Sequence, residues 1–493
     1  MDLLALTPLD DRLTPSYLEH FGLLPLGAEQ NVMRVASWHR EPDPQALDDL
    51  RLIFQSEIEI VFGPEQDLRA SIRRVYADER VTAERVIAEL PAPSGAAQRG
   101  ELALDDLVHL ANEAPVVKLV NLLLLEALEA RASDVHLEAS QQGQQVRYRV
   151  DGILQPAPSP PASLAAAVVS RLKIMAELDI AERRIPQDGR IRLKLQDRDV
   201  DVRVSTVPTL HGESIVLRLL DKEQHRGTLS DLGMGSETLA AVERAIARPH
   251  GIVLATGPTG SGKTTTLYAA IDRLRTGREK ILTVEDPVEY ELAGIAQVPV
   301  NEKVGVTFAS ALRALLRQDP DVMLVGEIRD RETADIATHA ALTGHMVLST
   351  LHTNDAPAAV TRLLDLGVAP FLVASTLEAV LAQRLVRVLC RACRRESPVP
   401  TEHQSLVGVA SRVFQPGGCS MCRGTGFRGR TGIYELMVMD DQVRTMVTMQ
   451  RSAGDLRAVA RSRGMRSLRE DGIRLVGDGV TTVEEVLRVT QSE

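Results

Sequence analysis

Residues 257–264 have the sequence Gly-Pro-Thr-Gly-Ser-Gly-Lys-Thr, which matches the spacing G-x-x-x-x-G-K-[ST]. The apolar run that starts at Gly251 predicts a buried strand before this segment, and residues 264–274 predict a helix after it. A glycine-rich turn between a strand and a helix directs several backbone N–H groups, and the positive end of the helix dipole, at one point. The segment therefore predicts a phosphate-binding loop in an α/β domain.

This loop defines the expected nucleotide site. Lys263 is expected to contact the β- and γ-phosphate oxygens, and the Thr264 hydroxyl is expected to bind Mg²⁺. The residues assigned to nucleotide binding in the loop are Gly257, Pro258, Thr259, Gly260, Ser261, Gly262, Lys263, Thr264 and Thr265. ATP and Mg²⁺ are therefore the expected substrate and cofactor.

The chain has four cysteines, which form two Cys-x-x-Cys pairs, Cys390/Cys393 and Cys419/Cys422. In a cytosolic chain such pairs mark metal or redox chemistry more often than disulfides. Two pairs with this separation are similar to a four-thiolate zinc site, which is closed and supports folding rather than catalysis. A redox-active dithiol remains open as an alternative, because nearby arginines such as Arg391 and Arg394 would lower thiol pKa values.

Composition excludes several classes of protein. A chain of 493 residues with 44% hydrophobic and 25% charged residues is an ordinary globular chain of about three domains. A net charge of −10 and 3% aromatic residues disfavour nucleic-acid binding. No apolar run is long enough to span a membrane, and no N-terminal signal is present. We therefore expect a cytoplasmic chain that reaches a membrane only through partners.

The chain divides by composition and periodicity. Residues 91–100 are rich in Pro, Gly and Ser and predict a linker, and residues 227–235 predict a second one. Strands that alternate with helices up to about residue 389 predict a mainly parallel sheet. The expected units are an N-terminal docking domain (1–95), a helix-plus-meander α+β domain (102–226), an α/β ATPase domain (236–389), a tetracysteine zinc module (390–430) and a helical C-terminal part (431–493).

Three further segments follow the loop in a fixed order. They are Ile-Leu-Thr-Val-Glu-Asp-Pro-Val-Glu at 281–289, Asp-Pro-Asp-Val-Met-Leu-Val-Gly-Glu-Ile-Arg at 319–329, and Thr-Gly-His-Met-Val-Leu-Ser-Thr-Leu-His-Thr-Asn at 343–354. With these segments the chain resembles the secretion ATPase superfamily, and within it the type II secretion ATPases (the GspE family). Residues 131–138, 183–190 and 382–387 support the resemblance, which is dense from 102 to 493 and loose before that.

The resemblance implies roles for the acidic residues. Glu289 would orient or deprotonate the attacking water, although Glu285 and Asp286 are close enough in sequence to contest that role. Glu327 takes the Walker B place and would act on the hydration shell of Mg²⁺. Phosphoryl transfer needs mainly positioning and charge neutralisation from the protein, so nearby cations matter as well.

The resemblance also implies two arginines and two histidines. Arg203 and Arg218 resemble the γ-phosphate arginines of the family; from their strand positions alone they would be solvated surface residues. His345 and His352 are assigned to the nucleotide site as parts of a γ-phosphate sensor, and the alternative is a pair of core histidines.

The resemblance implies a RecA-like P-loop ATPase domain preceded by a small PAS-like α+β domain, with a zinc-binding insertion. It further implies a homo-hexamer that powers pseudopilus assembly in type II secretion. Its partners would be the cytoplasmic domain of a bitopic inner-membrane protein, bound by residues 1–95, and a polytopic platform protein. Three alternatives stay open: a type IV pilus extension ATPase, a nucleic-acid translocase, and a scaffold that binds ATP without turnover.

Overall fold

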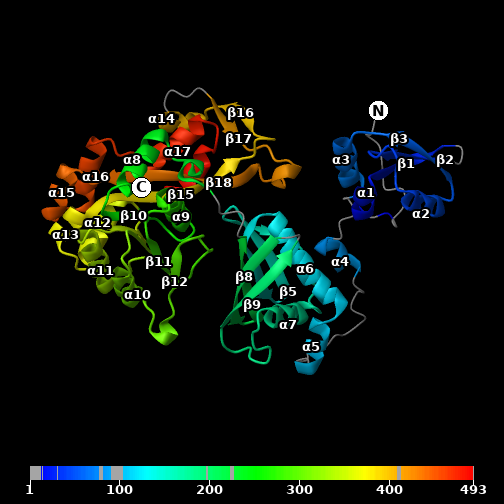
Figure 1. Cartoon of the computed structure of the whole chain (residues 1–493), viewed down its shortest axis with the longest axis horizontal. Helices are drawn as coiled ribbons and strands as arrows, with labels where there is room; N and C mark the ends of the chain where they lie inside the picture. The colour runs from blue at the N-terminus through cyan, green and yellow to red at the C-terminus, as the bar shows by residue number, and fades with distance from the viewer. Residues whose placement is uncertain are drawn as a thin grey trace.

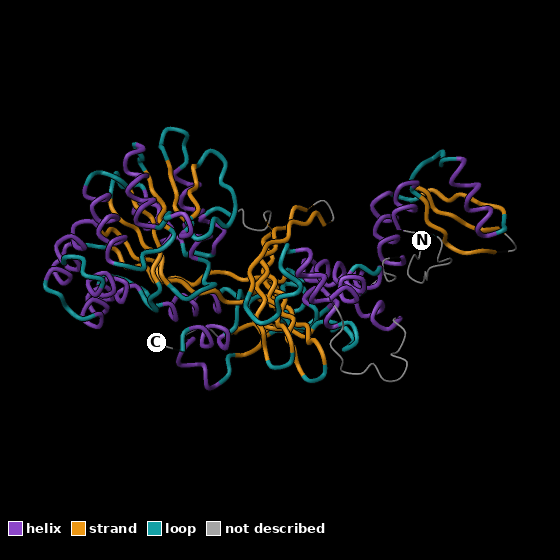
Figure 2. The backbone as a smooth tube through the Cα atoms, turned by 90° about the horizontal axis from the view of Figure 1, so that it is seen from below, coloured by secondary structure: helices purple, strands orange, loops and turns teal. Residues whose placement is uncertain are grey.

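The computed structural model describes residues 13, 15–29, 32–76, 82–89, 104–195, 198–221, 227–407 and 412–491. Figure 1 shows three groups of elements that follow one another along the chain, and Figure 2 shows the same groups from below. The predicted linker at 91–100 lies outside the described residues. No helix in the described part of the chain is both long and apolar enough to cross a membrane.

The first group is a three-stranded sheet with helices packed on it. Its elements are α1 (Pro15–Phe21), β1 (Leu23–Glu29), β2 (Val32–Ser37), α2 (Pro44–Phe54), β3 (Glu57–Phe62) and α3 (Glu65–Tyr76). β2 pairs antiparallel with β1 and parallel with β3, and Leu24, Val35 and Leu50 lie in the core.

Helix α4 (Ala83–Glu89) packs with the second group, although residues 1–95 were expected to form one unit. Ala83 and Val86 belong to the core of the second group, and the Ala83 N–H donates to the Glu126 carboxylate at 2.8 Å. The packing boundary of the first group therefore lies before residue 82, earlier than the sequence indicated.

The second group is a six-stranded antiparallel sheet, in the order β6-β5-β4-β9-β8-β7, with helices on one face. Its other elements are α5 (Leu104–Ala111), α6 (Ala114–Glu129), β4 (Ala132–Ser140), β5 (Gly143–Val150), β6 (Ile153–Pro156), α7 (Ala165–Met175), β7 (Gln187–Leu195), β8 (Arg198–Thr209) and β9 (Gly212–Asp221). Val202 and Leu217 point to the helices, so their neighbours Arg203 and Arg218 occupy the opposite face. The predicted α+β domain is confirmed.

The third group contains a seven-stranded sheet in the order β12-β11-β13-β14-β10-β15-β18, which is parallel except for β18. Its strands are β10 (Gly251–Thr256), β11 (Ile281–Glu285), β12 (Ala296–Pro299), β13 (Val322–Val325), β14 (Met346–Leu351), β15 (Leu377–Leu389) and β18 (Phe427–Val438). The expectation that residues 431–493 are helical is wrong at its start, because β18 continues to Val438 and pairs along the length of β15. The mainly parallel sheet is confirmed.

Helices cover both faces of this sheet and form two hydrophobic cores. They are α8 (Ser236–Ile246), α9 (Lys263–Leu274), α10 (Phe308–Leu315), α11 (Arg331–Leu342), α12 (Ala356–Asp365), α13 (Pro370–Thr376), α15 (Asp441–Thr448), α16 (Ala453–Ser462), α17 (Leu468–Gly477) and α18 (Val483–Val489), with short 3₁₀ turns at 229–232, 302–304 and 316–318. Between β15 and β18 the chain leaves the sheet and forms β16 (Arg395–Pro398), α14 (Gln404–Val407) and β17 (Arg412–Gln415), with 3₁₀ turns at 401–403 and 420–422.

Candidate functional site

The predicted site residues follow the carboxyl ends of neighbouring parallel strands. The phosphate-binding loop follows β10, Glu285 ends β11, Glu327 lies two residues after β13, and His352 follows β14 directly. Because these strands are parallel and adjacent, their carboxyl ends meet at one edge of the sheet, where ligands bind in open α/β sheets. The topology thus brings together segments that lie far apart in the sequence.

Lys263 is held over the loop that precedes it. Its Nζ donates to the carbonyl oxygens of Gly257 at 2.8 Å and Pro258 at 3.1 Å. Burial lowers the pKa of the Lys263 ammonium, against the opposing effect of Glu327 and with a further lowering by Arg384. The ammonium therefore lies at the loop with little water around it, and a bound anion would stabilise its positive charge.

The loop itself is braced from β15. Gln383 is almost fully buried; its amide donates to the Ser261 carbonyl at 2.6 Å, and its carbonyl oxygen accepts from the Thr266 hydroxyl at 2.9 Å. Gly257 has a φ of +146°, and a Cβ there would lie 2.5 Å from the backbone carbonyl oxygen of Gln383. Only glycine therefore lets the loop approach β15 this closely.

Two glutamates of the second predicted segment have different surroundings. Glu285 is 3% exposed. Its carboxylate accepts hydrogen bonds from the Tyr268 and Thr283 hydroxyls and, at 3.2 Å, from the side-chain amide of Gln297. Glu289 is partly exposed and forms an ion pair with Arg203 at 3.0 Å. Glu285 is thus satisfied by its own domain, while Glu289 faces the second group of elements.

Glu327 lies between an arginine and a histidine. Arg329 forms an ion pair with one carboxylate oxygen, and Nε2 of His352 lies 3.1 Å from the other. Burial acts to raise the pKa of Glu327, but its interactions with Arg329 and His352 outweigh burial and lower that pKa. Glu327 is therefore ionised at neutral pH and available as an acceptor for a hydrated cation.

The two predicted histidines lie at opposite ends of β14. His352 lines the cavity above the loop, whereas His345 precedes the strand, and its Nδ1 is 2.9 Å from the Ala340 carbonyl oxygen. A six-residue strand is roughly 20 Å long, so one nucleotide cannot contact both rings. His345 therefore does not line this cavity, and its assignment to the nucleotide site stays a prediction.

The cavity is shared between two groups of elements. It has a volume of about 780 Å³ and is lined on one side by residues 259–265, Glu289 and Glu327, and on the other by Asp134, Arg149 and Arg218. Arg203 does not line it directly but reaches across to Glu289 and to the Val288 carbonyl oxygen. A space of this size accommodates a nucleotide.

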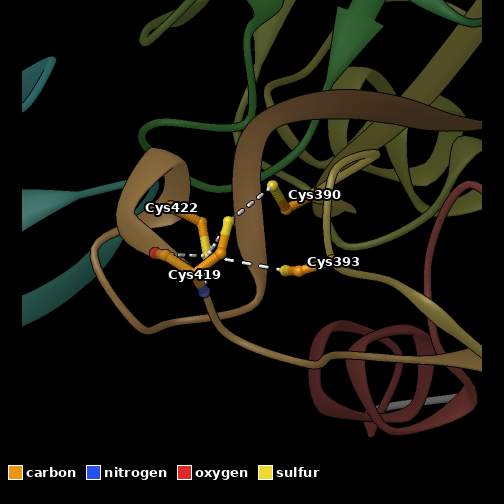
Figure 3. A group of neighbouring side chains, drawn as sticks. All are labelled: Cys390, Cys393, Cys419 and Cys422. Carbon is orange, nitrogen blue, oxygen red and sulfur yellow. Dashed lines mark hydrogen bonds between the residues drawn. The ribbon is translucent and has the colours of Figure 1, made fainter. Parts of the chain in front are cut away.

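The four cysteines converge, as Figure 3 shows. Cys390 directly follows β15, and Cys393 is one turn later. Cys419 precedes the 3₁₀ turn before β18, and Cys422 ends that turn. Sulfur–sulfur distances are 3.8 Å for Cys390–Cys419 and 3.7 Å for both Cys393–Cys422 and Cys419–Cys422, and the four sulfurs lie within 4.8 Å of one another. A tetrahedral zinc with bonds of about 2.3 Å requires edges of about 3.8 Å, so the four thiols fit such an ion.

Backbone N–H groups prepare one of these thiols for metal binding. Burial acts to raise the pKa of Cys422, but N–H donors of Cys419 and Gly426 outweigh it and bring that pKa to about 6. Burial and the neighbouring thiols instead raise the pKa of Cys393 to about 11. The first proton therefore leaves Cys422, and its thiolate is the form that binds a metal.

Several site residues were not found from the sequence. Gln383 lies in a segment that supported the resemblance, but nothing there indicated its contact with a loop 122 residues earlier. Asp134 lies in the supporting segment 131–138, and Arg149 lies opposite it on the next strand. Only the sheet register brings both residues to the cavity. The alternation of charged and apolar residues in β4 and β5 could have placed both on the face that carries Arg218.

Comparison with known proteins gives consistent matches. Residues 109–488 match the family described as type II/IV secretion system protein, and residues 2–82 match the MshEN domain. The Type II secretion system protein HxcR of Pseudomonas aeruginosa is 53% identical over 415 residues, covering 84% of this chain and 83% of that protein. The Type IV pilus assembly ATPase PilB of Myxococcus xanthus is 46% identical over 451 residues, covering 90% of this chain and 80% of that protein.

A solved structure agrees with the fold. The crystal structure of the pilus retraction motor PilT with bound ADP has a TM-score of 0.52 and 25% identity, covering 74% of this chain and 95% of that one. The family match spans more than half of the chain and includes every residue that lines the cavity. The chain therefore belongs to the type II/IV secretion system protein family, and it is an ATPase of the type II secretion branch.

Proposed function

We propose that the chain hydrolyses Mg²⁺-ATP in the cavity between its antiparallel and parallel sheets and uses the resulting domain movement to drive type II secretion. The observation that carries this proposal is that one cavity is lined by Lys263, Glu289 and Glu327 from one side and by Arg218 from the other. Arg218 belongs to the second group of elements, whereas the phosphate-binding loop belongs to the third. Hydrolysis therefore depends on how these two groups are arranged relative to one another.

Each residue has a distinct task in this proposal. Lys263 would neutralise charge on the β- and γ-phosphates, and the Thr264 hydroxyl would hold Mg²⁺, which would supply further positive charge at the phosphates. Glu327 would accept hydrogen bonds from water around that ion. Glu289 orients the attacking water; its ion pair with Arg203 at 3.0 Å ties water activation to the position of the second unit.

We infer that the four cysteines hold one structural Zn²⁺, since their spacing fits a tetrahedral thiolate site. The purified chain should contain about one Zn²⁺, and Cys393→Ser should lose it. Metal loss unfolds a thiolate site locally, so hydrogen exchange should accelerate first in residues 390–430. The control Ser420→Ala changes an exposed side chain between Cys419 and Cys422 and should keep the metal. Freshly purified chain without zinc would favour the redox alternative.

We propose that the active form is a homo-hexameric ring. In a closed ring each subunit constrains how its neighbours' units can close on nucleotide. Turnover per chain should therefore rise steeply as chains assemble, measured as phosphate release across a concentration series with light scattering. A dilute monomer that hydrolyses ATP as fast per chain as the assembled form would contradict the ring.

The proposed setting is the cytoplasmic face of the inner membrane. The first group of elements would bind the cytoplasmic domain of a bitopic inner-membrane protein, and the ring would act on a polytopic platform protein to extend a pseudopilus. This group is a small folded unit with its own core, which supports a docking role separate from the cavity. Nucleic acid is not a proposed partner.

The second candidate is a type IV pilus extension ATPase, which the similarity to PilB favours. A strain that lacks this chain separates the two, because it should stop releasing folded proteins into the medium while keeping its surface pili. Complementation with the wild-type chain should restore release, and the Lys263→Ala chain should not. Loss of pili with normal release would favour the pilus function.

A further inference from the structure

Five residues form a row across the antiparallel sheet, on the face that is not covered by helices. Each lies directly opposite the next on adjacent strands, in the order Arg190, Arg203, Arg218, Asp134 and Arg149. Directly opposed residues of neighbouring strands share a face, and like charges there repel. Four guanidiniums and one carboxylate therefore form a strongly positive row. Repulsion within the row destabilises the fold, and the same charge attracts an anion.

Asp134 is the only acid in this row, and it is 7% exposed. One of its oxygens accepts from Nε of Arg218 at 3.0 Å, and the other lies 3.7 Å from Nε of Arg149 and accepts from the Ser133 hydroxyl at 2.8 Å. Both guanidiniums therefore face Asp134 through Nε. Among the described residues, the two terminal nitrogens of Arg218 have no hydrogen-bond partner, and Nη1 of Arg149 donates to the Gly152 carbonyl at 3.1 Å.

We propose that Asp134 is a positioning residue that holds Arg218 and Arg149 as a pair facing the phosphates, and that Arg149 is a further phosphate-binding residue. Both arginines line the cavity that contains the phosphate-binding loop. A guanidinium anchored through Nε presents its terminal N–H groups in a fixed fork, the geometry that binds phosphate oxygens. The inference rests on the proposed function and extends it, since it needs ATP to occupy this cavity.

The charge of Asp134 predicts an unusual kinetic signature. Asp134→Asn keeps the size of the side chain but removes the carboxylate, so the field at the phosphates becomes more positive while the two guanidiniums lose their anchor. Nucleotide affinity should therefore stay constant or increase. Because misplaced catalytic groups cost on the order of 10²-fold in rate, kcat should fall about 10- to 100-fold. A purely structural loss would weaken binding and stability together.

A matched control lies on the same strand. Glu138 forms an ion pair with Arg147 across the same two strands, and neither residue lines the cavity. Glu138→Gln should therefore leave kcat and KM for MgATP unchanged. Arg149→Ala provides a second test on a partly exposed side chain, which tolerates truncation better than the buried Asp134; it should raise the nucleotide Kd several-fold and lower kcat about tenfold.

The decisive experiment is a double-mutant cycle in the full chain, with single-turnover MgATP hydrolysis, nucleotide binding and thermal unfolding measured for each variant. If Asp134 acts through Arg218 and Arg149, the Asp134→Asn substitution should lower the single-turnover rate less than about threefold in a chain in which both arginines are already alanine. The same loss in that background as in the wild type would overturn the positioning role. Near-normal kcat for Asp134→Asn and Arg149→Ala would overturn the whole inference.

Parallel variants separate this inference from the proposed function. If Lys263→Ala or Arg218→Ala retained full turnover, ATP hydrolysis in this cavity would be wrong, and the inference would fail with it. If both lost turnover while Asp134→Asn and Arg149→Ala behaved like the wild type, the proposed function would stand, and only the inference would be overturned.

Discussion

Lys263→Ala is expected to lose ATP turnover by about 10³-fold or more, to below detection in a phosphate-release assay. The ammonium is held over the loop by the carbonyl oxygens of Gly257 and Pro258, and no other lysine in the described part of the chain lines the cavity. Removing one neutral donor from a charge-stabilising site already costs about 10²–10³ in rate, and a full positive charge contributes more. The exposed Lys303→Ala is the matched control and should keep wild-type turnover.

Stability should change little or rise in the same Lys263→Ala variant. Burial lowers the pKa of Lys263 in the folded chain, which means that folding disfavours its charged form. Below the folded pKa this group therefore costs stability; the cost disappears above the unfolded pKa. An equal or higher melting temperature together with lost turnover would locate the effect in catalysis. A lower melting temperature would attribute the lost activity to unfolding instead.

Glu289→Gln is expected to abolish hydrolysis while ATP binding persists. A positioned general base contributes about 10²–10⁴ in rate, and glutamine keeps the shape of the side chain without its basicity. Glu289 is the acid whose surroundings suit this role, because it is partly exposed, lines the cavity and pairs with Arg203. Single-turnover hydrolysis and nucleotide binding measured on the same preparation separate chemistry from affinity.

Glu285→Gln tests the competing assignment. The Glu285 carboxylate is buried and accepts hydrogen bonds from Tyr268, Thr283 and Gln297. An amide there places a donor against other donors, which costs about 1–3 kcal/mol of stability. We therefore expect a lower melting temperature and a modest loss of activity. Lost hydrolysis with unchanged stability and binding would transfer the catalytic role to Glu285.

The features that the sequence predicted are those carried by local patterns. The strand, loop and helix around Lys263 form one continuous segment, and regular alternation of strands and helices indicated the parallel sheet. The cysteine cluster followed from two short spacings. β3 has the sequence Glu-Ile-Glu-Ile-Val-Phe, whose alternation of polar and apolar residues is typical of a strand, whereas Pro25 and Gly27 weaken the strand signal of β1.

The features that the sequence did not predict depend on contacts between distant segments. Asp134 meets Arg218 across 84 residues, and Gln383 reaches Ser261 across 122. Both contacts depend on which strands become neighbours in the sheet, and this is decided between segments that lie far apart in the sequence. The same reason explains the error at β18. This strand pairs with β15, which lies on the other side of the cysteine module in the sequence, and no local pattern in residues 431–438 indicates that pairing. His345 and His352 were placed together because they are close in sequence, but a strand separates them in space.

The central claim is that ATP is hydrolysed between the two sheets, with Arg218 of the antiparallel sheet acting on the γ-phosphate and Arg203 acting through its ion pair with Glu289. The most direct measurement is single-turnover MgATP hydrolysis by assembled Arg203→Ala and Arg218→Ala chains, alongside nucleotide binding. The account predicts a loss of at least about 10³ in rate for each variant, the lower end of an arginine finger's contribution, with affinity kept within several-fold. Near-normal rates in both variants would contradict it and return these arginines to the role of solvated surface residues.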